Sequence, residues 1–115
     1  MIQLARLNVR TAGDVVVAEI SGEIDMSNAI DLREAMIASL TNRTAGLVVD
    51  LSEVTYLDSA AIHVVYDLRS QLAARALQLR LVVPPDAPTL STLRLTGVPE
   101  AVPVLATAAE AEASI

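Results

Sequence analysis

Residues 47–62 constrain the fold of this chain more than any other stretch. Residues 47–51 are apolar except for Asp50 and rich in branched side chains, as in a buried strand, and a short polar connector follows. Asp58 and Ser59 then precede apolar residues with helical spacing, which predicts a helix from Ser59 to about residue 74 or 76. The Ser59 oxygen can cap that helix, and the backbone N–H groups there would also stabilise a phosphate. Adding or removing a phosphate at this position could change a surface charge without changing the fold.

The rest of the chain continues this alternation of strand and helix. The first helix is expected to begin at Ser27 or Asn28 and to bury Ile30, Met36 and Leu40, together with Ala35 and Ile37. Turn and breaker residues separate the segments, including Gly13, the pair Pro84-Pro85, and Gly97. The expected segments are strands at 3–10, 15–20, 47–51 and 77–83, helices at 27–40, 59–74, 89–96 and 107–113, and a weak edge strand at 102–105.

This order of elements predicts the fold class. Strands that alternate with helices imply parallel pairs joined by right-handed crossovers, and the opening hairpin adds an antiparallel edge. The expected structure is a single α/β domain over residues 1–115, with a mixed sheet of four to five strands and about four helices. Residues 15–20, which are mostly apolar, are expected to be covered on both faces or to lie centrally in the sheet. Residues 50–59 are expected to form a loop at the carboxyl end of a strand, where sites usually lie in such sheets.

Composition argues against several classes of function. The net charge is −6 and the arginines are scattered, so nucleic-acid binding is not expected. The chain has no cysteine and one histidine, which leaves no thiolate or ordinary zinc site, and no cofactor is expected. No apolar run approaches the roughly 20 residues of a membrane span, and the N-terminus does not resemble a signal peptide. We therefore expect a cytoplasmic protein without membrane insertion, monomeric in solution.

Two segments carry a resemblance to a known family. The first is Gly22-Glu23-Ile24-Asp25, between an expected strand and the first long helix. The second is residues 49–62, which combine a strand end, Asp-Leu-Ser, a short connector and an apolar-Asp-Ser sequence. With the spacing between them, they resemble the STAS family, whose simplest members are bacterial anti-sigma factor antagonists. The resemblance covers roughly residues 4–111 and implies a STAS-like fold.

The resemblance also implies a function. In such antagonists, the serine after the motif aspartate is phosphorylated by the anti-sigma factor, which is an ATP-dependent serine kinase. The unphosphorylated antagonist binds that kinase and releases the sigma factor for transcription, and a cognate phosphatase restores this form. Here the serine is Ser59, a substrate of another enzyme, so the chain is expected to have no catalysis of its own. The expected partner-binding residues are Asp25, Ser27, Asn28, Asp58, Ser59, Ala60, Ala61 and His63.

Three residues depart from the family pattern. Ala60 and Ala61 stand where the family usually has a second serine or other small residue followed by glycine. His63 stands where a small residue is frequent. An imidazole one turn beyond Ser59 leaves the hydroxyl in place but can alter the choice of partner.

Two other functions fit parts of the sequence. A STAS domain can also serve as a scaffold in a stress-signalling or lipid-transport complex. Alternatively, Ser59, His63 and Asp67 are spaced to share one helical face, as a nucleophile, a base and an orienting acid would require in a small serine hydrolase. Hydrolase triads are generally assembled from separate elements, and no Gly-x-Ser-x-Gly motif accompanies Ser59. The residues therefore favour the binding functions.

Overall fold

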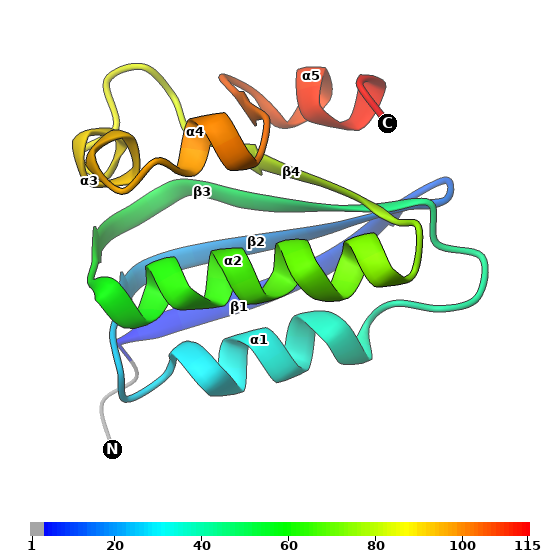
Figure 1. Cartoon of the computed structure of the whole chain (residues 1–115), viewed down its shortest axis with the longest axis horizontal. Helices are drawn as coiled ribbons and strands as arrows, with labels where there is room; N and C mark the ends of the chain where they lie inside the picture. The colour runs from blue at the N-terminus through cyan, green and yellow to red at the C-terminus, as the bar shows by residue number, and fades with distance from the viewer. Residues whose placement is uncertain (1–3) are drawn as a thin grey trace.

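An opening hairpin followed by helical crossovers builds one mixed sheet in the computed structural model, which describes residues 4–115 (Figure 1). Residues 1–3, which include the start of the first expected strand, lie outside this description. The strands are β1 (Ala5–Ala12), β2 (Val15–Ile24), β3 (Gly46–Leu57), β4 (Gln78–Val82) and β5 (Val104–Leu105). The helices are α1 (Ala29–Ala38), α2 (Ser59–Ala74), α3 (Leu90–Leu95), α4 (Val98–Ala101) and α5 (Ala108–Ala113).

The strands lie in the sheet in their chain order, β1-β2-β3-β4-β5. β1 pairs antiparallel with β2, and the other neighbouring strands pair parallel. The expected α/β class and the mixed sheet are confirmed. The short helix α4 was not expected, because Pro99 and Pro103 suggested only a break there. Proline is well tolerated in the first turn of a helix, and Pro99 occupies that turn of α4.

Helices cover both faces of the sheet over β2 and β3. Val16 and Ala18 face the large core beneath α1 and α2, whereas Val15 and Val17 pack with Ala111 of α5 on the other face. The expectation that this strand is covered on both faces is therefore confirmed for residues 15–18. α4 contacts α2, and α3 packs against α4. The hydroxyl of Tyr66 on α2 donates to the backbone oxygen of Thr96, at 2.9 Å, and ties these elements together.

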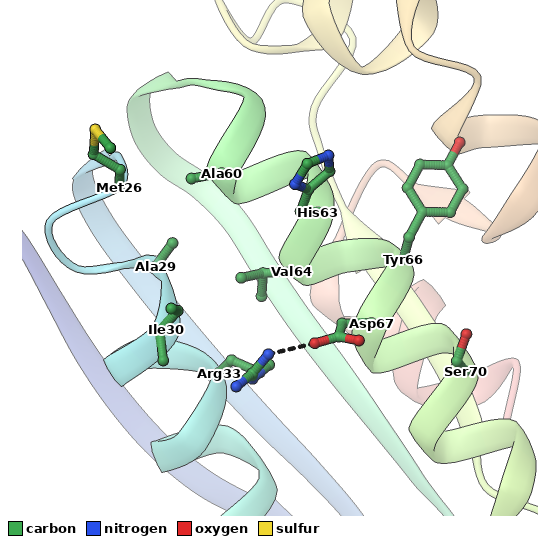
Figure 2. A pocket seen from close by; sticks show the side chains of 10 residues that line it. All are labelled: Met26, Ala29, Ile30, Arg33, Ala60, His63, Val64, Tyr66, Asp67 and Ser70. Atoms are coloured by element: carbon green, nitrogen blue, oxygen red, sulfur yellow. Dashed lines mark hydrogen bonds and ion pairs between the residues drawn. The ribbon is translucent and has the colours of Figure 1, made fainter.

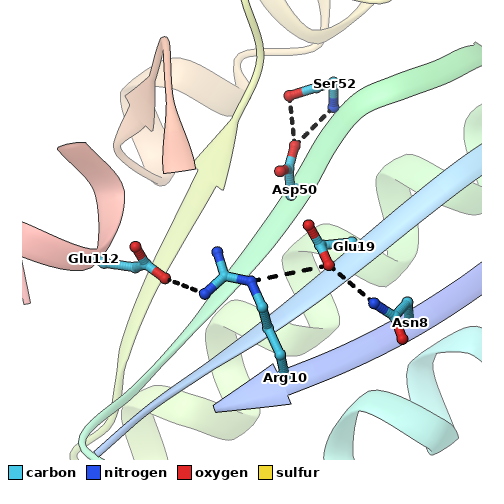
Figure 3. A network of polar contacts seen from close by, with 6 residues as sticks. All are labelled: Asn8, Arg10, Glu19, Asp50, Ser52 and Glu112. Atoms are coloured by element: carbon cyan, nitrogen blue, oxygen red, sulfur yellow. Dashed lines mark hydrogen bonds and ion pairs between the residues drawn. The ribbon is translucent and has the colours of Figure 1, made fainter. Parts of the chain in front are cut away.

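Polar side chains join β1, β2 and α5 on the second face (Figure 3). Arg10 donates to Glu112 at 2.7 Å and lies 3.9 Å from Glu19, which accepts from Asn8 at 3.0 Å. Arg10 thus links the first strand to the last helix.

Within the described chain, no helix is both long and apolar enough to cross a membrane.

Two strands run further than the sequence indicated. β2 continues to Ile24, and β3 continues to Leu57 through residues expected to form a polar connector. Leu51, Val54 and Leu57 are buried in the core, while the polar residues between them are wholly or partly exposed. The register between β2 and β3 shifts at two irregular positions along this extension. These shifts interrupt the regular alternation of buried and exposed residues, so the sequence at the end of β3 does not have the pattern typical of a strand.

The buried face of α1 also differs from the expected one. Ile30 and Ala35 are exposed, whereas Ala29 and Met36 are almost completely buried. Positions 29 and 36 lie two turns apart on the face that meets the sheet, and Ile30 points away from it. The tertiary position of the helix, rather than the size of each side chain, decides which residues are covered.

Candidate functional site

Asp58, and not Ser59, caps α2. The Asp58 backbone is extended, and its Oδ1 accepts from the backbone N–H of Ala60 at 2.9 Å and of Ala61 at 3.4 Å. The prediction that Ser59 caps this helix is wrong, because β3 continues up to residue 57 and leaves residue 58 at the boundary. Ser59 is the first residue of the helix. An aspartate is as good a cap as a serine, so the sequence did not separate the two.

The Ser59 side chain is consequently left available. It is exposed, and within residues 4–115 its hydroxyl makes no hydrogen bond to another group. It stands on the first turn of a 16-residue helix, where backbone N–H groups and the helix dipole favour negative charge.

The loop between β2 and α1 is held by its own side chains. Asp25 Oδ1 accepts from the Ser27 hydroxyl and from the Ser27 backbone N–H at 2.8 Å. The bond from the Ser27 hydroxyl has the larger effect, and together the two bonds lower the pKa of Asp25 below its ordinary value. Asn28 accepts from the Asp25 N–H at 3.1 Å and donates to the Glu23 carbonyl at 2.9 Å. Asn28 takes the N-cap position of α1, but its side chain makes no capping bond, because it orients the loop instead.

The fold brings this loop next to the start of α2. β2 and β3 are parallel neighbours, and Ile24 lies opposite Leu57 at their carboxyl ends. The N–H of Asp58 donates to the Ile24 carbonyl at 3.2 Å. Asp25 and Asp58 therefore leave adjacent strands at the same edge of the sheet, near Ser59.

The remaining expected partner-binding residues differ in accessibility. His63 is exposed, and Ala60 is half-buried. Ala61 is only 4% exposed and packs in the core, so its side chain does not belong to the surface around Ser59. Its N–H serves the site indirectly, as the second donor to Asp58.

The residues expected for a hydrolase do not form a triad. Asp67 pairs with Arg33 of α1 rather than with His63 (Figure 2). Among the described residues, no hydrogen bond joins His63 to Ser59 or to Asp67. A general base that neither contacts its nucleophile nor is oriented by an acid lacks the geometry of this catalysis. Within residues 4–115, no group of three or more acidic or histidine side chains is placed to bind a metal ion.

A cleft of about 640 Å³ lies between α1 and α2 (Figure 2). Its lining includes Ala60, the residue that follows Ser59 in the chain. Met26 and Ile30 line one side, Ala60 and His63 line the other, and Val64 contributes further apolar surface. Met26 is 82% exposed and Ile30 is 56% exposed. The sequence did not indicate this cleft, because the spacing of Ile30 predicted a buried position. An exposed methionine in the loop before the helix was the available signal.

Comparisons with known proteins agree with this fold. The family model of the STAS domain matches residues 6–111. An anti-sigma factor antagonist from Mycobacterium paratuberculosis is 28% identical, with a TM-score of 0.85 over 96% of this chain and 93% of that chain. A putative anti-sigma factor antagonist from Thermotoga maritima is 20% identical, with a TM-score of 0.81 over 95% and 93%. No curated protein sequence matches the chain.

A third similar structure is that of the Bacillus cell fate determinant SpoIIAA in the phosphorylated form. It is 18% identical to this chain, with a TM-score of 0.67 over 95% of this chain and 98% of that chain. At this identity the likeness shows the fold.

Proposed function

We propose a function from the premise that this chain belongs to the STAS domain family. The protein is an anti-sigma factor antagonist, and phosphorylation of Ser59 controls its binding to an anti-sigma factor that is a serine kinase. In the unphosphorylated state it binds the kinase and so releases the sigma factor for transcription. A phosphatase removes the phosphate and restores binding. The similarity to an anti-sigma factor antagonist at 28% identity supports the general role.

The availability of Ser59 carries the proposal. Its hydroxyl is exposed and takes no part in capping, because Asp58 bonds the backbone of the first turn. A kinase can therefore reach the oxygen without unfolding the helix. The phosphorylated form known for SpoIIAA, which has the same fold, supports modification of a STAS domain.

Charge explains why a phosphate would prevent binding. A phosphoserine adds about −1.5 to −2 charges at neutral pH. At Ser59 this charge would join Asp58 and Asp25 on an acidic surface. The start of α2 tolerates the phosphate in the free protein, but a partner surface shaped for a hydroxyl would have to desolvate it. A loss of about 3–4 kcal/mol weakens binding by two to three orders of magnitude.

The proposal is tested by incubating the protein with ATP and, in turn, with each anti-sigma-type serine kinase of its source genome. We expect one kinase to phosphorylate Ser59, as located by phosphopeptide mapping. Ser59→Ala should abolish the reaction while retaining kinase binding, and Ser59→Asp should weaken binding. Ser91→Ala, at an exposed serine of α3 outside the surface around Ser59, is the matched control and should be phosphorylated as the wild type is.

Two results would count against this function. If no active kinase modifies Ser59, regulation by phosphate is excluded, and a scaffold role in a larger complex becomes the better explanation. If Ser59→Asp binds the kinase as tightly as the wild type, the argument from charge is wrong.

A further inference from the structure

We propose that the cleft between α1 and α2 is an anchor site for the kinase, and that it accepts one large apolar side chain from the kinase surface. This inference rests on the proposed function and extends it to a second contact region. The lining of the cleft includes Ala60, next to Ser59 in the chain, but not Ser59 itself, so its residues take no part in the phosphoryl transfer itself.

The position of the cleft makes contact with the kinase a geometric consequence of phosphorylation. Ala60 follows Ser59 directly, and His63 lies one turn further along α2; both line the cleft. A specific interface covers about 800 Å² on each partner, whereas one helical turn advances only about 5.4 Å. A kinase that places its nucleotide against Ser59 therefore also covers the mouth of the cleft.

The walls of the cleft fit an apolar group. Met26 and Ile30 are among the few large apolar side chains exposed on the described surface, and both line the same side. Ala29 forms part of the lining and is itself buried, so the inner surface is also apolar. Leaving such side chains in water is unfavourable, and covering them is the usual source of affinity in the centre of an interface.

The charged groups of the cleft are already paired. Arg33 of α1 and Asp67 of α2 form an ion pair across it, as the dashed line in Figure 2 shows. An incoming cation or anion would have to compete with this pair, whereas an apolar side chain leaves it intact. The neutralised pair and the apolar walls together favour an aliphatic or aromatic side chain over a charged one.

The test compares cleft variants with a control on the same helix. Ile30→Glu adds one negative charge inside the cleft, and glutamate is favourable in the first turn of a helix, so the variant should fold. Met26→Ser removes the other large apolar side chain on the same side of the cleft, at a position in the loop before α1. Ala35→Glu adds the same charge to an exposed site of α1 outside the cleft.

The measurements are the affinity for the kinase that modifies Ser59, by calorimetry, and the kinetics of phosphorylation. We expect Ile30→Glu to weaken binding by about 30-fold, as loss of an anchor contact does. Met26→Ser should weaken it to a smaller extent. Both variants should raise KM for the antagonist while leaving kcat unchanged, because the reacting hydroxyl is untouched. Ala35→Glu should behave as the wild type does.

The outcomes separate this inference from the proposed function. If the wild type is phosphorylated on Ser59 but both cleft variants bind as tightly as it does, the anchor site is excluded and the function stands. The anchor site is equally excluded if Ala35→Glu weakens binding as much as Ile30→Glu, since charge alone would then explain the effect. If no kinase binds or modifies the wild type, both proposals are wrong.

Discussion

At the start of α2, neighbouring side chains have different roles. The Asp58 carboxylate accepts two backbone N–H bonds, while the Ser59 hydroxyl faces solvent. Asp58→Ala should therefore lower the free energy of unfolding by about 1 kcal/mol, the usual loss for a helix cap. Urea denaturation followed by circular dichroism measures this difference.

Ser59→Ala is the matched control for that measurement. Its hydroxyl makes no hydrogen bond within the described chain, so its removal should change the free energy of unfolding by less than about 0.5 kcal/mol. A cost equal to that of Asp58→Ala would show that Ser59 shares the capping role.

Asp25 provides a second prediction at the scale of single residues. The Ser27 bonds lower its pKa in the folded protein, so they add stability above the pKa of the unfolded state. This stability is lost as the pH falls through the lowered folded value. Ser27→Ala removes the hydroxyl bond and should move the pKa of Asp25 upward, toward its ordinary value. Carboxyl carbon shifts in an NMR titration report the change, and Ser70→Ala should leave the Asp25 curve where it is.

At the scale of elements, Gly22 allows β1 and β2 to meet near the site. Its φ is +95°, and a Cβ there would lie 2.1 Å from the Leu4 carbonyl oxygen. Gly22→Ala should therefore lower the free energy of unfolding by about 2–4 kcal/mol, through backbone strain and a clash with main chain. Thermal denaturation of the variant checks this value.

Gly13, in the hairpin turn, separates the two causes. Its φ is also positive, at +63°, but a Cβ would meet nothing within 4 Å. Gly13→Ala should cost only about 1 kcal/mol, from the left-handed conformation. Equal losses of unfolding free energy for Gly22→Ala and Gly13→Ala would mean that the close approach of the Leu4 carbonyl adds nothing to the cost.

At the scale of the whole molecule, α5 completes the core on the second face of the sheet. Ala111 is fully buried among Val15, Val17, Val48 and Val82. Ala111→Glu would bury an unpaired charge and should lower the free energy of unfolding by about 3 kcal/mol or more. Ala109→Glu, at an exposed position of the same helix, should change it by no more than about 0.5 kcal/mol. Urea denaturation of both variants decides whether α5 belongs to the cooperative unit, and similar values would show that it does not.

Much of the fold could be predicted from local patterns. The runs at 15–20 and 47–51 predicted the inner strands, because central strands bury both faces and leave a mostly apolar sequence, here interrupted only by Glu19 and Asp50. The polar end of β3 was missed for the opposite reason. One face of it lies outside the core, and its irregular register with β2 hides the alternation.

The candidate site, like the fold, could be predicted from the sequence only in part. The position of Ser59 before a helix and the resemblance carried by residues 22–25 and 49–62 were available from the sequence, because they depend on neighbouring residues. The capping role of Asp58 could not be predicted from the sequence, since it depends on where β3 ends. The exposure of Ile30, the burial of Ala61 and the cleft between α1 and α2 depend on how the helices lie against the sheet. Local sequence thus determined most of the elements and the candidate serine, and only the packing of those elements decided which side chains surround it.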